Sequence, residues 1–153
     1  MVAFDLDMNT GMIHLTFNET VNVSSLIVEQ ITLQSDLYET ENTTQFVFNS
    51  ASGTGSNSPD WPTITINIGS DDLNEIKRLS DLAISANTTY LSLMQFSIED
   101  TNANRVVPTV ITVTNYTEDA TPPQVTSFTF DLNLGQLHFT FSETVNVLSL
   151  IHI

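Results

Sequence analysis

Apolar and polar residues alternate over most of the chain, in short runs separated by turn-forming residues. In residues 2–8 every second side chain is apolar, and residues 12–17 repeat this pattern after the sequence Asn-Thr-Gly. A period of two is typical of a β-strand that buries one face, and two such runs joined by a short turn predict a β-hairpin. The side chains expected to face the core are Phe4, Leu6, Met8, Ile13, Leu15 and Phe17.

Further runs have the composition of β-strands, and turn signals separate them at regular intervals. They cover residues 31–35, 44–50, 62–68, 89–100 and 106–116. One stretch between the strands at 62–68 and 89–100 has the helical period instead, with apolar residues at Leu73, Ile76, Leu79, Leu82 and Ala83. We expect Ser70 to cap this helix, and Asp71 and Asp72 to lie favourably at the positive end of its dipole. The pattern therefore predicts an all-β, antiparallel sandwich with one short helix near residues 71–84.

The first hairpin occurs twice in the sequence. At an offset of 124 positions, residues 4–29 align without a gap to residues 128–153, and 15 of the 26 pairs are identical. A fixed period of this kind predicts tandem modules. We expect a complete module over residues 1–120, a Pro-rich linker and the start of the next module over 121–127, and the first hairpin of that module over 128–153. The sequence leaves open whether the second hairpin continues in the same chain or is donated to a neighbouring subunit.

Two motifs resemble the bacterial-type Ig-like repeats of extracellular surface and filament proteins. They are the linker "DATPPQV" and the sequences "LTFNETVNV" and "FTFSETVNV", which end the second strand of each copy. The resemblance implies an Ig-like β-sandwich and a role as a segment of a stalk, filament or adhesin. Where the bacterial pattern usually has Pro after the Glu, this chain has Thr20 and Thr144.

Charge and composition exclude several classes of function. The chain has 18 acidic residues against three Lys and Arg, for a net charge of −15, so phosphate backbones and anionic membranes would be repelled. We expect neither nucleic-acid binding nor membrane insertion. Without cysteine there is no disulfide or thiolate metal site, and no pattern of a catalytic triad or carboxylate pair is present. We therefore expect a protein that is not an enzyme and needs no cofactor.

Five Asn-x-Ser/Thr sequons make covalent glycans the predicted modification. We expect Asn18 to face outward and Asn42 and Asn87 to lie in polar loops, so these three are favoured. Asn22 has the character of a turn residue, and Asn115 shares the strand parity of buried neighbours, which is less favourable. The sequons begin at Asn18, Asn22, Asn42, Asn87 and Asn115.

Three further features have an ordinary interpretation beside a functional one. Asp100, Asn102 and Asn104 alternate as oxygen ligands of Ca²⁺ do, but an Asn-rich hairpin loop is the favoured interpretation. Trp61 could stack on a sugar, although a half-buried turn position is commoner. Glu118 and Asp119, at the module junction, could help to bind a cation between modules, but a solvated linker is the favoured interpretation.

The sequence thus favours a structural repeat module of an extracellular, glycosylated filament or cell-surface fibre. Its partners would be copies of itself or adjacent repeats, assembled head to tail. The alternatives are a carbohydrate- or partner-binding adhesin, in which the loop at residues 50–61 supplies the contact surface, and an accessory domain of a secreted hydrolase.

Overall fold

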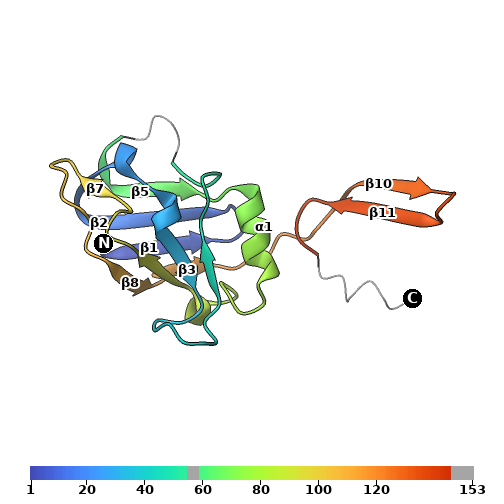
Figure 1. Ribbon diagram of the computed structural model, residues 1–153, viewed down its shortest axis with the longest axis horizontal. Coiled ribbons are helices and arrows are strands. Elements are labelled where there is room, and N and C mark those ends of the chain that lie inside the picture. The colour runs from blue at the N-terminus through green and yellow to red at the C-terminus, as the bar shows by residue number, and fades with distance from the viewer. Residues whose placement is uncertain (55–58, 146–153) are drawn as a thin grey trace. The chain divides into compact units, whose positions relative to one another are not determined.

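The computed structural model describes residues 1–54 and 59–145, so parts of the loop at 50–61 and of the predicted second hairpin (residues 55–58 and 146–153) lie outside it. The described chain is all-β with one short helix and divides into two compact units, Met1–Asp119 and Ala120–Ile153 (Figure 1). The strands of the first unit are β1 (Ala3–Asp7), β2 (Met12–Asn22), β3 (Ile31–Gln34), β4 (Gln45–Val47), β5 (Trp61–Asn67), β6 (Tyr90–Leu93), β7 (Glu99–Asp100), β8 (Thr109–Thr112) and β9 (Asn115–Thr117). Helix α1 covers Ser70–Arg78, and the second unit contains β10 (Val125–Asp131) and β11 (Gln136–Phe141).

Two sheets of the first unit share one apolar core. The first has the strand order β5-β2-β1-β9, with β7 also paired to β2, and the second has the order β4-β3-β6-β8. All pairings are antiparallel except that of β1 with β9, which is parallel. Alternate residues of both sheets are fully buried, as the alternation in sequence predicts. They include Phe4, Leu6, Ile13 and Leu15 from the first sheet and Ile31, Leu33, Leu91 and Leu93 from the second.

Helix α1 lies at one end of these sheets, beside the β1–β2 turn, and the N-terminus lies at the other end (Figure 1). The predicted helix at 71–84 is too long, because α1 ends at Arg78 and Leu79 has an extended backbone. Leu82 and Ala83 are buried as their spacing suggests, but they lie in turns, and Ala83 has a φ of +52°. The predicted cap is also wrong: Gly69 is the N-cap residue, and Ser70 is already helical.

Two predicted strands are interrupted. The run at 89–100 breaks into β6 and β7, because Ser97 turns back and donates its backbone N–H to the carbonyl of Met94. The run at 106–116 breaks into β8 and β9, which belong to different sheets. At this break Val113 donates to Thr89 and Thr114 donates to Phe4, so adjacent residues bond to opposite sheets.

The second unit is a hairpin with the same register as β1 and β2. Asp5 pairs with His14 and Leu6 with Ile13; 124 positions later, Thr129 pairs with His138 and Phe130 with Leu137. The strand β10 begins at Val125, inside the segment predicted as linker.

Candidate functional site

Several polar contacts converge on the segment 114–119, where the chain leaves the first unit. We call this segment the exit strand. Strand β9 lies parallel to β1, and the register pairs Asp5 with Asn115 and Asp7 with Thr117. Beyond this pairing, Met8 donates its backbone N–H to the carbonyl of Thr117 at 3.0 Å. The first and last strands of the unit are therefore bonded directly to each other.

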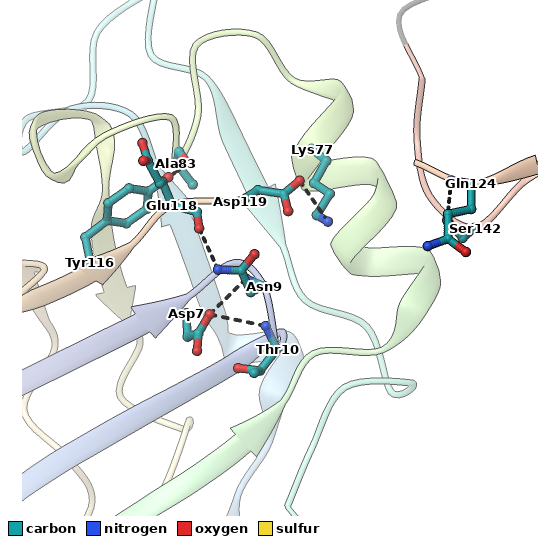
Figure 2. Close-up of polar contacts among 10 residues, drawn as sticks. All are labelled: Asp7, Asn9, Thr10, Lys77, Ala83, Tyr116, Glu118, Asp119, Gln124 and Ser142. Carbon is teal, nitrogen blue, oxygen red and sulfur yellow. Dashed lines mark hydrogen bonds and ion pairs between the residues drawn. The ribbon is translucent and has the colours of Figure 1, made fainter. Parts of the chain in front are cut away.

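The β1–β2 turn holds the end of the exit strand through Asn9. The Asp7 carboxylate accepts the backbone N–H groups of Asn9 and Thr10 at 2.8 and 3.2 Å, which fixes the turn, and the Asn9 amide donates to the carbonyl of Glu118 at 2.9 Å (Figure 2). Burial works to raise the pKa of Asp7, but hydrogen bonds from Thr10 and Asn9 outweigh it and hold this pKa below its ordinary value. Gly11 completes the turn with a φ of +65°, a conformation that favours glycine.

Helix α1 and the turn after it supply two more contacts to the exit strand. Lys77 forms an ion pair of 2.9 Å with Asp119, and the hydroxyl of Tyr116 donates to the carbonyl of Ala83 (Figure 2). Burial raises the pKa of Tyr116, and the charges of Glu118 and Asp119 add to this effect. Glu118 and Asp119 are both exposed, as predicted for a solvated segment, but the Asp119 carboxylate and the Glu118 carbonyl each have a partner in the first unit. Together these contacts fasten the departing chain to β1, the β1–β2 turn and α1.

The second unit repeats the turn geometry of the first. Asp131 accepts the backbone N–H groups of Asn133 and Leu134 at 2.8 and 3.0 Å, and Gly135 has a φ of +62°. At the open end of this hairpin Gln124 and Ser142 exchange two hydrogen bonds, of 2.8 and 2.9 Å (Figure 2). Residues 127–141 therefore fold into the same local structure as residues 3–17, whereas residues 142–145, the counterparts of the last part of β2, are not in a strand.

The structure places all five sequons at the surface or near it. The side chains of Asn18, Asn42, Asn87 and Asn115 are exposed, and that of Asn22 is partly buried. Asn22 caps a short 3₁₀ turn (Val23–Ser25) by accepting the backbone N–H of Ser24, which agrees with the predicted turn role. Asn115 is exposed because the break between β8 and β9 resets the strand parity, and its amide donates to Asp5 at 2.9 Å.

The candidate calcium ligands lie together in one tight loop. Asp100 accepts the backbone N–H groups of Asn102 and Asn104 at 2.8 Å each, and the Asn104 amide at 2.8 Å. These bonds alone explain the spacing of the three residues as an Asn-rich loop. Within residues 1–54 and 59–145, no group of three or more His, Cys, Asp or Glu side chains is arranged to hold a metal ion.

Asp100→Asn should destabilise the loop between β7 and Arg105 in a pH-dependent way. Hydrogen bonds from the side chain and backbone of Asn104 lower the pKa of Asp100 below its ordinary 3.8, although burial opposes this. A depressed folded-state pKa means that the stabilisation is present above pH 3.8 and is lost as the pH falls through the folded-state value. We expect the difference in melting temperature between wild type and variant to shrink below pH 3.8. A difference that stays constant as the pH falls from neutral to strongly acidic would contradict this, and Thr101→Ala is the control in the same loop.

The outer face of β5 is polar and carries an exposed tryptophan. Trp61 is the first residue of β5 and is 63% exposed, so the half-buried turn position predicted for it is wrong. It lies in a depression of about 430 Å³ that is lined also by Pro59, Thr63, Ile64 and Thr65. On the neighbouring strand, His14 forms a hydrogen bond of 2.8 Å with Thr65.

Sequence reasoning missed the contacts of Asp72 and Lys77. Asp72 is 1% exposed and accepts hydrogen bonds from Asn49 and Ser52, in the loop before β5. The acidic first turn and basic last turn of α1 are evident in the sequence, but the partners of these side chains lie far away along the chain.

No helix in the described part of the chain is long and apolar enough to cross a membrane. No family model, curated protein or solved structure matches this chain.

Proposed function

We propose that residues 1–119 form one Ig-like module of a tandem array, and that the array is an extracellular, glycosylated filament, stalk or surface fibre. The observation that carries this proposal is the duplicated hairpin. Residues 4–29 and 128–153 share 15 of 26 residues, and the described parts of both copies have the same register, the same aspartate-centred turn and the same glycine conformation.

The strand order supports the Ig-like assignment. In an Ig sandwich the second strand lies between the first and fifth, and the sixth lies between the third and the last. Here β2 lies between β1 and β5, and β6 lies between β3 and β8. The exit strand then crosses to β1, which brings the chain out at the end opposite the N-terminus (Figure 1). Entry and exit at opposite ends suit a module that is joined head to tail.

The fastening of the exit strand supports a structural role. A tension on the chain would reach the core through Asp119 and Glu118, and these residues are held by Lys77 and Asn9. The Pro pair at 122 and 123 stiffens the link to the next module. The polar groups that converge on the exit strand thus have a structural use, and we propose no catalytic role.

Limited proteolysis of the native protein tests the array. The segment Ala120–Gln124 follows the first unit and lies outside the strands, and equivalent links would be cut at regular intervals. We expect a ladder of fragments whose lengths differ by about 124 residues, the offset of the repeat. Fragments without a common spacing would contradict the proposal.

The same proposal predicts glycans at Asn18, Asn42 and Asn87 in protein from its native source. Each of these side chains is exposed, so a glycan can be carried without burying it. Enzymatic release of N-glycans converts the occupied Asn to Asp, and mass spectrometry of peptides then identifies each site. Asn115 is the comparison within the same protein. Its side-chain amide, the group that would carry the glycan, donates a hydrogen bond to Asp5, so fewer molecules should be glycosylated there. Finding the peptides that contain Asn18, Asn42 and Asn87 only in their unmodified form would contradict the prediction.

The exposed Trp61 favours a second candidate function, binding of carbohydrate. The indole shares its depression with Thr63 and Thr65, so a stacking face and side chains that can form hydrogen bonds line one site. Trp61 is the only tryptophan, so its fluorescence reports on this site alone. Titration with a panel of soluble oligosaccharides should change this fluorescence, and Thr63→Ala should weaken the response. If no oligosaccharide of the panel changes the Trp61 fluorescence, carbohydrate binding at this site is contradicted and the structural role alone remains proposed.

A further inference from the structure

The second hairpin exposes the apolar face that its counterpart in the first unit buries. Phe4 and Leu15 are fully buried, whereas Phe128 and Phe139, at the equivalent positions, are 66% and 52% exposed. The same contrast holds along the whole face. The exposed residues are Phe128, Phe130, Leu132, Leu137 and Phe139, and their buried counterparts are Phe4, Leu6, Met8, Ile13 and Leu15.

The first unit shows what covers a hairpin of this kind. Its apolar face packs in one cluster with the second sheet, in which Leu33 of β3 and Leu91 of β6 are fully buried. Its two edges are also occupied, since β9 pairs with β1 and β5 pairs with β2. All of these elements lie between Ile31 and Thr117. A segment with that strand pattern therefore buries the apolar face of such a hairpin and also pairs with both of its edge strands.

We propose that the exposed face of β10 and β11 is a docking surface for a polypeptide with the strand pattern of residues 30–119. This inference rests on the proposed repeat and names its partner: a sheet equivalent to β4-β3-β6-β8, with strands equivalent to β5 and β9 at the hairpin edges. The second hairpin aligns with residues 4–29, and the strands that cover the first hairpin all follow this stretch, so the partner is a segment equivalent to Gln30 onward.

A second copy of the same chain fits this surface less well. In such a copy the second sheet is already covered by its own β1 and β2, and the incoming hairpin would have to displace them. It would also bring Phe130 and Phe139 into the positions of Leu6 and Leu15. Larger side chains in a filled core force neighbours to shift. The partner sheet therefore has smaller side chains, or more space, opposite Phe130 and Phe139.

A graft tests the docking surface on the full chain. Residues 30–119 are appended after Ile153, which makes a continuous second module from a sequence that forms these strands in the first unit. We expect the backbone amides of β10 and β11 to exchange at least about 100-fold more slowly in the graft than in the 153-residue chain. The variant F130L/F139L restores the side chains of the first unit at both positions, and its graft should show stronger protection still.

Two controls show whether the ordered partner strands are the cause of this protection. In a graft whose appended residues are scrambled, exchange in β10 and β11 should remain as fast as in the ungrafted chain. Fast exchange in both ordered grafts, with the first unit still folded, would overturn the proposal. So would slow exchange of β10 and β11 in the ungrafted chain at concentrations where it dimerises, because a second copy would then be the partner. Limited proteolysis tests the native array independently of the graft. The docking surface and the proposed fibre can therefore be contradicted separately.

Discussion

Leu15→Ala should lower the free energy of unfolding of the first unit by about 2–5 kcal/mol, the usual cost of truncating a fully buried leucine. Leu15 is 0% exposed and lies in the centre of β2, between β1 and β5. The loss combines the apolar surface that is no longer buried with the cavity that is left behind. Urea unfolding followed through the amide resonances of β3 and β6 would measure it, because both strands belong to the first unit.

The equivalent substitution in the second unit is the matched control. Phe139 stands 124 positions after Leu15, and its change to alanine removes a larger side chain. Phe139 is already 52% exposed, and its ring contacts Phe128 and Phe141 of the same hairpin. We expect Phe139→Ala to change the unfolding of the first unit by less than about 0.5 kcal/mol. A similar loss of first-unit stability from Phe139→Ala would show that Phe139 packs against the first unit, and would contradict the exposed docking surface.

The hairpins were predictable because the residues that determine their strands and turns are close together in the sequence. Alternation identifies Phe4 and Leu6 as core residues, and the structure confirms that both are buried. The turn needs only Asp7 and Gly11, which are close in sequence. The repeat extended the same prediction to β10 and β11 without further assumptions, and both strands are present.

The interruptions were not predictable from local pattern, because they are decided by distant partners. The stretch at 109–116 contains no Gly or Pro that would indicate a break, yet Val113 bonds to Thr89, next to β6 of the second sheet, and Thr114 bonds to Phe4 in the first sheet. The helical period continues to Ala83, but the N–H of Ala83 bonds to Thr88 and its backbone is left-handed. In each case the local sequence gives no signal at the position where the hydrogen bonds change partner.

The polar contacts were the least predictable part of the candidate site. Lys77 and Asp119 are 42 positions apart, and neither has a neighbour in sequence that indicates the ion pair. Asp71 and Asp72 look equivalent in sequence, as two carboxylates in the first turn of a helix. The structure separates them, because Asp71 is exposed and Asp72 is 1% exposed.

Asp72→Ala should therefore destabilise the first unit far more than Asp71→Ala. The Asp72 carboxylate accepts the backbone N–H of Asn49 at 3.1 Å, the side-chain amide of Asn49, and the hydroxyl of Ser52 at 2.7 Å. Ser52 in turn accepts the N–H of Gly69, at the start of α1. Without the carboxylate, buried donors of the loop lose their acceptor, at about 1–3 kcal/mol for each group left unsatisfied.

We expect a loss of about 2–4 kcal/mol for Asp72→Ala, since some of these donors will find water. Asp71→Ala removes only a favourable charge near the helix N-terminus, which contributes about 0.3–1 kcal/mol. Asp72→Asn distinguishes charge from shape, because it keeps one acceptor oxygen and should fall between the two. Thermal unfolding at neutral pH would measure all three variants. Equal losses for Asp71→Ala and Asp72→Ala would show that the helix dipole alone accounts for both carboxylates, and that the contact between α1 and the loop before β5 contributes nothing to stability.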